Sequence, residues 1–176
     1  SRLVRALLIQ HALTGSTIET DFFNEAAAII EELLPLAESE LGQLHPVTVD
    51  VRKQQGDLYF HKNDVARAHE LYSQVLDESR ALYDSGNIKI ADAATAVAMV
   101  EMMSGGHEGT EDLFTEAIEI YQTTVGDQYP AAYNARTFLA NLMTGQERHD
   151  EAEPLLRSVL DVLVQRHGND SMQVLN

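Results

Sequence analysis

The sequence lacks several residue types, and each absence excludes a class of function. It contains no Cys, which excludes disulfides, thiolate metal ligands and cysteine nucleophiles. It has only 12 Lys and Arg against 28 Asp and Glu, a formal net charge of −16. So little positive charge argues against binding a nucleic-acid backbone or an anionic membrane surface. No apolar run reaches the roughly 18 residues of a membrane span. The lack of a disulfide framework favours a cytoplasmic protein.

What the sequence does contain is a repeat with a period of 42 residues. Gly126 and Gly168 are one period apart, Gly42 lies two periods before Gly126, and Pro46 and Pro130 are also two periods apart. Shifting the chain by one period aligns four apolar columns without a gap. They are Ile29, Leu71, Leu113 and Leu155; Ile30, Tyr72, Phe114 and Leu156; Leu33, Val75, Ala117 and Val159; and Leu34, Leu76, Ile118 and Leu160. A column of small residues precedes them: Ala26, Ala68, Thr110 and Ala152.

The spacing of these columns predicts α-helices. They fall at i, i+1, i+4 and i+5, which places them on one stripe of a helix. Each repeat then holds a shorter helix A, a polar turn and a helix B. We expect A helices over 2–14, 46–61, 88–103 and 130–144, and B helices over 22–41, 64–83, 109–125 and 150–167. Pro35 is expected to kink the first B helix, and Pro154 to fall in the first turn of the last one.

The chain is therefore predicted to be all-α, a single array of about four repeats. The expected repeat units are 4–45, 46–87, 88–129 and 130–171. The tail Ser171–Asn176 matches the start of a further A helix, so we expect the chain to be part of a longer protein.

Three segments resemble the tetratricopeptide (TPR) repeats of kinesin light chains, which also recur every 42 residues. Leu41-Gly42-Gln43-Leu44-His45-Pro46 looks like their Leu-Gly-x-x-His-Pro junction, and Val125–Pro130 is a degraded copy of it. The segment Asp150–Leu156 resembles the opening of their helix B. The resemblance implies a right-handed superhelix of antiparallel helix pairs and a protein-binding role. The Asn-Asn pair that the family carries in helix A is missing at 53–54, 95–96 and 137–138.

In TPR proteins the A helices line the inner surface, and the resemblance therefore implies a partner-binding groove. The register places nine residues on that face: Asp50, Lys53 and Asp57; Asp92, Thr95 and Met99; and Asn134, Thr137 and Asn141. Each trio is spaced i, i+3, i+7, so its members share one side of a helix. Short polar side chains in a groove suit hydrogen bonds to a peptide. The alternative interpretation is a solvated surface that binds nothing.

Other candidate sites have simpler interpretations. Met99, Met102 and Met103 cluster at the end of one expected helix. Flexible thioether side chains suit either an adaptable binding surface or the filling of gaps in the hydrophobic core, and we expect these three to lie in the core. His107 and His149 are one period apart and occupy the same turn position, so they are predicted to be structural equivalents and not metal ligands. No carboxylate has an apolar sequence context that would raise its pKa. No enzyme, cofactor or metal site is predicted.

Two classes of function remain open. The first is a protein–protein interaction module, a scaffold or adaptor whose groove binds a peptide or helix of a partner, with a segment carrying Lys or Arg favoured. The second is a regulatory helical domain that senses a ligand or peptide and controls an attached effector domain. Self-association through the end repeats is a third alternative, because the array lacks an evident polar cap. Neither a nucleic acid nor a membrane is an expected partner.

Overall fold

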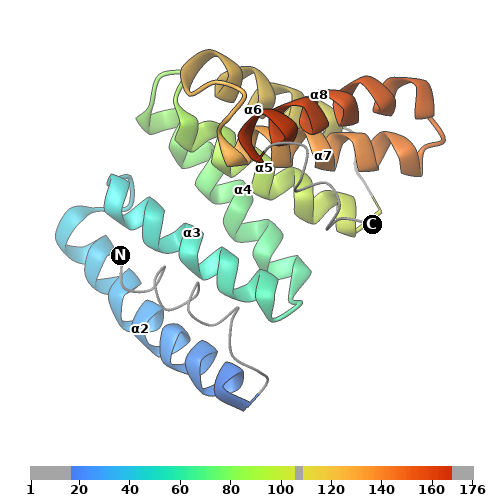
Figure 1. Cartoon of the computed structure of the whole chain (residues 1–176). Helices are drawn as coiled ribbons and strands as arrows, with labels where there is room; N and C mark the ends of the chain where they lie inside the picture. The colour runs from blue at the N-terminus through green and yellow to red at the C-terminus, as the bar shows by residue number, and fades with distance from the viewer. Residues whose placement is uncertain (1–16, 106–108, 168–176) are drawn as a thin grey trace. The chain divides into compact units, whose positions relative to one another are not determined.

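The computed structural model describes residues 17–105 and 109–167, and every regular element among them is an α-helix. The helices are α2 (Thr17–Leu41), α3 (Pro46–His61), α4 (Val65–Leu82), α5 (Ile88–Met103), α6 (Thr110–Thr124), α7 (Pro130–Gly145) and α8 (His149–His167) (Figure 1). The chain divides into two compact units, residues 1–82 and 83–176.

The predicted helix bounds agree closely with the structure, and the all-α prediction is confirmed. Helices α3 and α5 have the predicted ends, α7 and α8 differ from prediction by one residue at one end, and α4 and α6 are shorter by one residue at each end. The largest difference is α2, which begins at Thr17 and not at residue 22. No Gly or Pro lies between Gly15 and Phe22 to interrupt the helix, so α2 can extend back beyond the predicted start. The predicted helix over 2–14 lies outside the described residues.

The junction residues act as helix caps and turns, as their spacing predicted. The Nδ1 atom of His45 accepts a hydrogen bond from the backbone N–H of Val47 at 3.2 Å, and Pro46 follows at the first position of α3. The turns before α3 and α7 contain Gly42 at φ 90° and Gly126 at φ 82°. A side chain would be strained at these positive φ values, which explains why both turns have Gly at the same place in the repeat.

The first unit contains α2, α3 and α4, with each helix packed on the next. Ile30 of α2 and Val51 of α3 are buried against each other, and Ile29, Leu33 and Leu34 of α2 pack around them. Helix α3 lies very close to α4 at Gly56. A Cβ atom built there would be 2.7 Å from Cε1 of Tyr72.

The second unit contains α5 to α8, again with consecutive helices packed together, and α5 also contacts α7. Helix α5 is rich in Ala and is buried on most sides, because small side chains allow neighbouring backbones to approach closely. Phe114 of α6 stacks on Phe138 of α7, with ring centroids 6.0 Å apart. Because α5 contacts α7, the A helices of neighbouring repeats lie side by side in this unit.

The small-residue column confirms the predicted register. Ala26, Ala68, Thr110 and Ala152 are all buried. Pro35 lies inside the continuous helix α2. Pro154 is the sixth residue of α8, beyond the first turn in which it was predicted, because the helix begins at His149. Its missing N–H therefore removes one hydrogen bond of the helix interior.

Candidate functional site

Six of the nine predicted groove residues lie in the second unit, on the neighbouring helices α5 and α7. Asp92, Thr95 and Met99 of α5 are partly exposed, as is Thr137 of α7, while Asn134 and Asn141 are exposed. All six side chains are thus accessible. Because α5 contacts α7 directly, we treat these six residues together and call them the α5–α7 face.

Asp92 is held in place by a residue that the sequence did not single out. The hydroxyl of Tyr121, on α6, donates a hydrogen bond to Oδ1 of Asp92 at 2.7 Å. Burial, followed by the charge of Asp92, raises the pKa of Tyr121 well above its ordinary value. The phenol therefore keeps its proton and remains a donor, and its hydrogen bond fixes the position of the Asp92 side chain on α5.

The two threonines of the face satisfy part of their hydrogen bonding within their own helices. Thr95 donates to the carbonyl of Ala91 at 2.8 Å, and Thr137 donates to the carbonyl of Tyr133 at 2.8 Å. Their hydroxyl protons are therefore engaged, and the exposed amides of Asn134 and Asn141 are the better placed groups for hydrogen bonds to a ligand.

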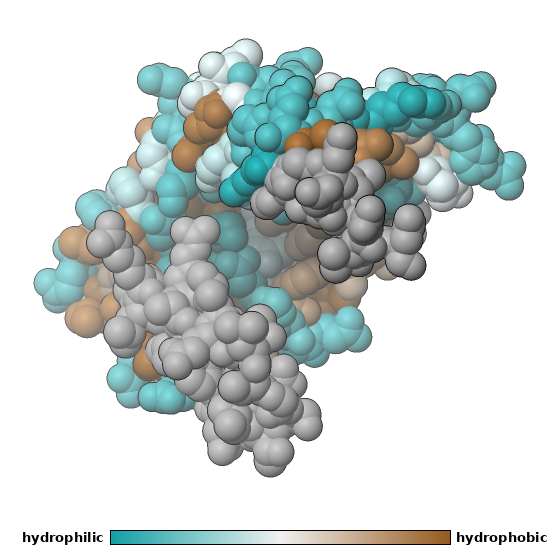
Figure 2. Space-filling model, in the orientation of Figure 1, coloured by the Kyte–Doolittle hydropathy of each residue, from teal (hydrophilic) through white to brown (hydrophobic). Residues whose placement is uncertain are grey.

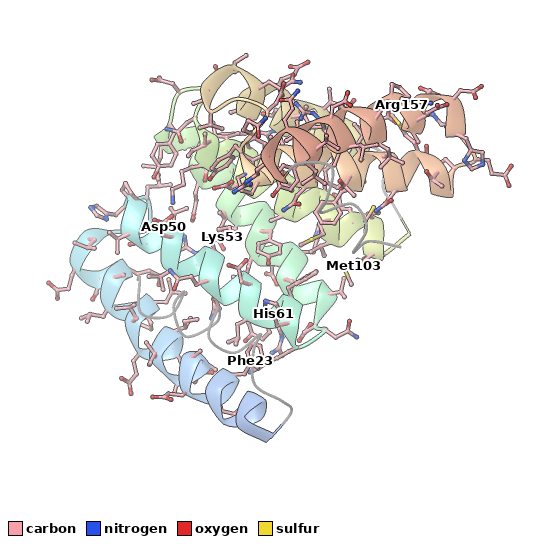
Figure 3. All side chains as sticks on the ribbon, in the orientation of Figure 1. Phe23, Asp50, Lys53, His61, Met103 and Arg157 are labelled. Atoms are coloured by element: carbon pink, nitrogen blue, oxygen red, sulfur yellow. The ribbon has the colours of Figure 1, made fainter. Side chains whose placement is uncertain are left out.

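The other three predicted groove residues lie on α3, in the first unit (Figure 3). Lys53 Nζ lies 3.0 Å from Oδ1 of Asp57, and the hydroxyl of Tyr72 donates to the same oxygen at 2.8 Å. Burial and the charge of Asp57 raise the pKa of Tyr72, which remains a donor. Lys53 neutralises Asp57, so the α3 face is less acidic than counting its carboxylates suggested. Asp50 is partly exposed on the same helix.

The most buried charged group in the first unit was missed by sequence reasoning. The Arg52 guanidinium is 3% exposed and bridges three helices. Its Nη2 lies 2.7 Å from Oε1 of Glu38 on α2, and its Nη1 donates to Glu78 on α4. Glu78 also accepts a hydrogen bond from the Gln74 side chain at 3.0 Å. This ion triad ties the three helices of the first unit together.

The second unit has a buried arginine two periods further along, at Arg136. It donates to Asp127, but its Nη1 is buried without a hydrogen-bond partner among the described residues. The counterpart of Glu78 in this repeat is Val162, which is buried and apolar. The counterpart of Glu38 is Gln122, so the repeat has kept the arginine, lost both carboxylates at their positions and pairs the arginine with Asp127 instead.

An ion cluster joins α6 to the turn before α8. Arg148 Nη1 lies 2.6 Å from Oε2 of Glu111, and its Nη2 lies 2.7 Å from Oε2 of Glu151. Hydrogen bonding to this guanidinium lowers the pKa of both carboxyl groups below their usual range. Both therefore remain charged, and the arginine of one repeat is tied to helix B of the repeat before it.

A shallow groove of about 500 Å³ opens on α8, where hydrophobic side chains reach the surface (Figure 2). Its lining is Thr144, His149, Ala152, Glu153, Leu156, Arg157 and Leu160. None of the predicted groove residues is among them, so sequence reasoning missed this site. The periodicity could have revealed it, because Leu156 and Leu160 continue columns that are largely buried in the earlier repeats.

The remaining candidates from the sequence are three methionines and two histidines. Met103 is exposed, so the expectation that the methionine cluster fills the core is wrong for this member, while Met99 and Met102 are partly buried. His149 is exposed at the start of α8, and His107 lies outside the described residues. In the described part of the chain, no group of three His, Asp or Glu residues is arranged to hold a metal ion. No helix over these residues combines the length and apolarity of a membrane span.

Comparison with known proteins agrees with the repeat pattern. Residues 89–163 match the tetratricopeptide repeat family. This stretch of the chain is thus a tetratricopeptide repeat segment. No curated protein is similar enough in sequence to count as a relative of the chain.

Solved structures extend the likeness in fold over almost the whole chain. One is the set of nearly identical TPR-like repeats from a Podosopora anserina protein named as a kinesin light chain, with 19% identity and a TM-score of 0.65 over 92% of this chain and 76% of that chain. A variant of the same repeats gives 20% identity and a TM-score of 0.67, over 91% of this chain and 76% of that chain. The third is BtubC (BKLC) from P. vanneervenii, with 22% identity and a TM-score of 0.74 over 94% of this chain and 66% of that chain. At these identities the likeness shows the fold, which is the TPR-like arrangement predicted from the period.

Proposed function

We propose that this chain is a protein-interaction module whose α5–α7 face binds a segment of a partner carrying Lys or Arg. The observation that supports the proposal is the pairing of an anchored carboxylate with exposed amides on two helices in contact. Tyr121 fixes Asp92 on α5, and Asn134 and Asn141 are exposed on α7. An array of TPR repeats is in general a surface for binding proteins or peptides.

Each group of the face has a distinct part in this proposal. The Asp92 carboxylate attracts a Lys or Arg side chain, and its fixed position lowers the entropy that the complex must lose. Asn134 and Asn141 lie seven residues apart, about two helical turns, and each amide offers donors and an acceptor to a peptide backbone. Partly exposed Met99 supplies an adaptable apolar contact beside them.

The charge of the whole chain supports a basic partner. With a net charge of −16, the protein attracts cationic segments over long range and speeds their encounter at low salt. The α3 face contributes less to recognition, because Lys53 already neutralises Asp57. We therefore assign the main recognition role to the α5–α7 face.

The test is a selection of random 12-residue peptides displayed on phage against the intact protein. A counter-selection uses the variant Asp92→Asn, Asn134→Ala, Asn141→Ala. We expect the enriched peptides to carry Lys or Arg, and to lose about fivefold in affinity for Asp92→Asn alone, because an exposed charge pair contributes roughly 0–1 kcal/mol. Affinity should also fall between 0.1 M and 1 M salt, as the Debye length drops from about 10 Å to about 3 Å.

A matched control removes an exposed carboxylate elsewhere in the same unit. Asp112→Asn, on helix B α6, should leave the affinity of the selected peptides unchanged. If the selected peptides bind the triple variant as tightly as the parent, the α5–α7 face is not the binding site.

A further inference from the structure

Helix α5 carries two accessible methionines where the other A helices carry polar residues or Gly. Met103, at the end of α5, is 51% exposed, and Met99 is partly exposed (Figure 3). In the 42-residue register, the same two positions hold Asp57 and His61 on α3 and Asn141 and Gly145 on α7. Because the same fold accepts these residues, an apolar side chain at either position is not required for packing. The two methionines are therefore a feature of this helix and not of the repeat.

The two methionines lie in line with the anchored carboxylate of the α5–α7 face. Met99 follows Asp92 by seven residues, and Met103 follows it by eleven. At 3.6 residues per turn, the three side chains lie within about 40° of one another around the helix, whereas Met102 lies about 80° from Asp92. One carboxylate and two apolar side chains thus share a line along α5 that is about 16 Å long.

Helix α7 lies beside this line and offers groups that suit a peptide backbone. Short turns join α5 to α6 and α6 to α7, so α5 and α7 run in the same direction. Since the two helices are in contact, their repeat counterparts lie at the same level. Asn134 and Asn141 therefore present exposed amides at the levels of Asp92 and Met99. A Cβ atom built at Gly145, the counterpart of Met103, would meet open space.

The exposed amides favour an extended ligand over a helical one. The backbone groups of a helix bond to one another, whereas an extended segment keeps N–H and C=O groups free for the Asn side chains. An extended segment rises about 3.3 Å per residue, and its side chains alternate between two faces. Two side chains four residues apart therefore point the same way and lie about 13 Å apart. That distance reaches from Asp92 to the space between Met99 and Met103.

We propose that the α5–α7 face selects an extended segment of a partner protein in which a Lys or Arg lies four residues from a large apolar side chain. The basic side chain pairs with Asp92. The apolar side chain packs between Met99 and Met103, whose flexible thioethers adapt to its shape. Because an exposed charge pair is weak, the apolar contact supplies affinity that Asp92 alone does not. This inference rests on the function proposed above, to which it adds a second anchor and its spacing.

The test is an NMR titration of the intact protein labelled with ¹³C in its methionine methyl groups. Each synthetic peptide holds one Arg and one Leu in a background of Gly and Ser, and their spacing runs from one to seven residues in both orders. We expect the highest affinity at a spacing of four residues in one of the two orders. That peptide should bind about tenfold more tightly than its partner with Ser in place of Leu, because Leu buries apolar surface on the methionines.

Variants of the methionines check where the Leu side chain binds. Met99→Gln and Met103→Gln keep the side-chain length and should each weaken the Leu peptide about threefold, without changing the affinity of the Ser peptide. Met102→Gln is the matched control, since Met102 is partly exposed on the same helix but lies off the line, and it should change neither affinity. The Leu peptide should shift the methyl signals of Met99 and Met103, and not that of buried Met143.

The result for Asp92→Asn separates failure of this inference from failure of the proposed function. If Asp92→Asn weakens the Leu and Ser peptides alike but spacing has no effect, the α5–α7 face binds basic segments without a second anchor, and the inference is wrong. It is also wrong if affinity is highest at seven residues, the spacing of a helical ligand, or if both Met→Gln variants bind the Leu peptide as the parent does. If Asp92→Asn changes neither affinity, the proposed function fails as well.

Discussion

Replacing Arg52 with Met should destabilise the first unit more than any exposed ion-pair change in the protein. Arg52 is buried between two carboxylates, and the Glu78 side chain is only 10% exposed. Met preserves much of the side-chain volume but leaves the Glu78 charge without its partner. Removing one member of a buried ion pair costs about 3–5 kcal/mol, because the remaining charge stays out of water without compensation. Glu38, 34% exposed, can turn toward solvent and should add little to this cost.

The magnitude can be checked by urea unfolding followed by far-ultraviolet circular dichroism. A loss of about 3–5 kcal/mol is a large share of the roughly 5–15 kcal/mol that stabilises an ordinary domain, so the midpoint of the transition should fall clearly. Arg157→Met is the matched control, because its pairing with Glu153 has a similar distance but is solvent-exposed. We expect the control to cost roughly 0–1 kcal/mol.

A double variant separates the lost ion pair from lost packing. Arg52→Met with Glu78→Leu removes both buried charges and leaves an apolar pair of similar volume. Such replacements are often neutral or stabilising, so the double variant should recover most of the stability lost in Arg52→Met. The reasoning is refuted if Arg52→Met costs less than about 1 kcal/mol, or if the double variant is no more stable than the single one.

Two further predictions each compare the same substitution at two positions with different surroundings. Gly56→Ala should lower stability by about 1–3 kcal/mol in thermal melts, because the new Cβ would lie 2.7 Å from the Tyr72 ring. Gly145→Ala, which has open space around its Cβ, should be neutral or stabilise by up to about 1 kcal/mol. Equal effects of the two substitutions would contradict the close approach of α3 and α4. Val162→Glu should lower the free energy of unfolding in urea by about 2 kcal/mol less than Ile120→Glu. Only Val162→Glu puts a carboxylate at the counterpart of Glu78 in a repeat that has a buried arginine, Arg136. Equal costs would mean that the new carboxylate does not reach the Nη1 atom of Arg136.

The period and the junction residues predicted the helices well because both act through local physics. His45 and Pro46 start α3 whatever the rest of the chain does, and Gly42 permits a turn that other residues resist. The alignment of the apolar columns at the 42-residue period then predicted which face each helix buries. Only the start of α2 was misplaced by more than one residue, although Ser16 and Glu19 have the spacing of a capping box in the sequence there.

The candidate site was predicted less completely because side-chain pairing depends on how helices cross. The register placed Asp57 and Asp92 on accessible faces, but their tyrosine partners come from unrelated columns. Tyr72 occupies one of the apolar columns, whereas Tyr121 is 49 residues later and shares no column with it. A period of 42 therefore cannot relate the two hydrogen bonds. The groove on α8 was missed for a different reason, since an apolar column predicts burial and does not show where the covering helix is missing.

The arginine column shows how a repeat can change its interior without changing its fold. Arg52, with Glu78 opposite, is followed one period later by Ala94 with Ile120 opposite, so the charged pair is replaced by an apolar pair at both positions together. A change at only one of the two would leave a buried charge unpaired, which is costly. The last repeat has that arrangement: Val162 stands at the counterpart of Glu78, and Arg136 is paired with Asp127 while its Nη1 is buried without a hydrogen bond among the described residues. The same columns thus hold a satisfied ion pair, an apolar pair and a half-satisfied arginine, so the equivalent substitution should have a different cost in each repeat.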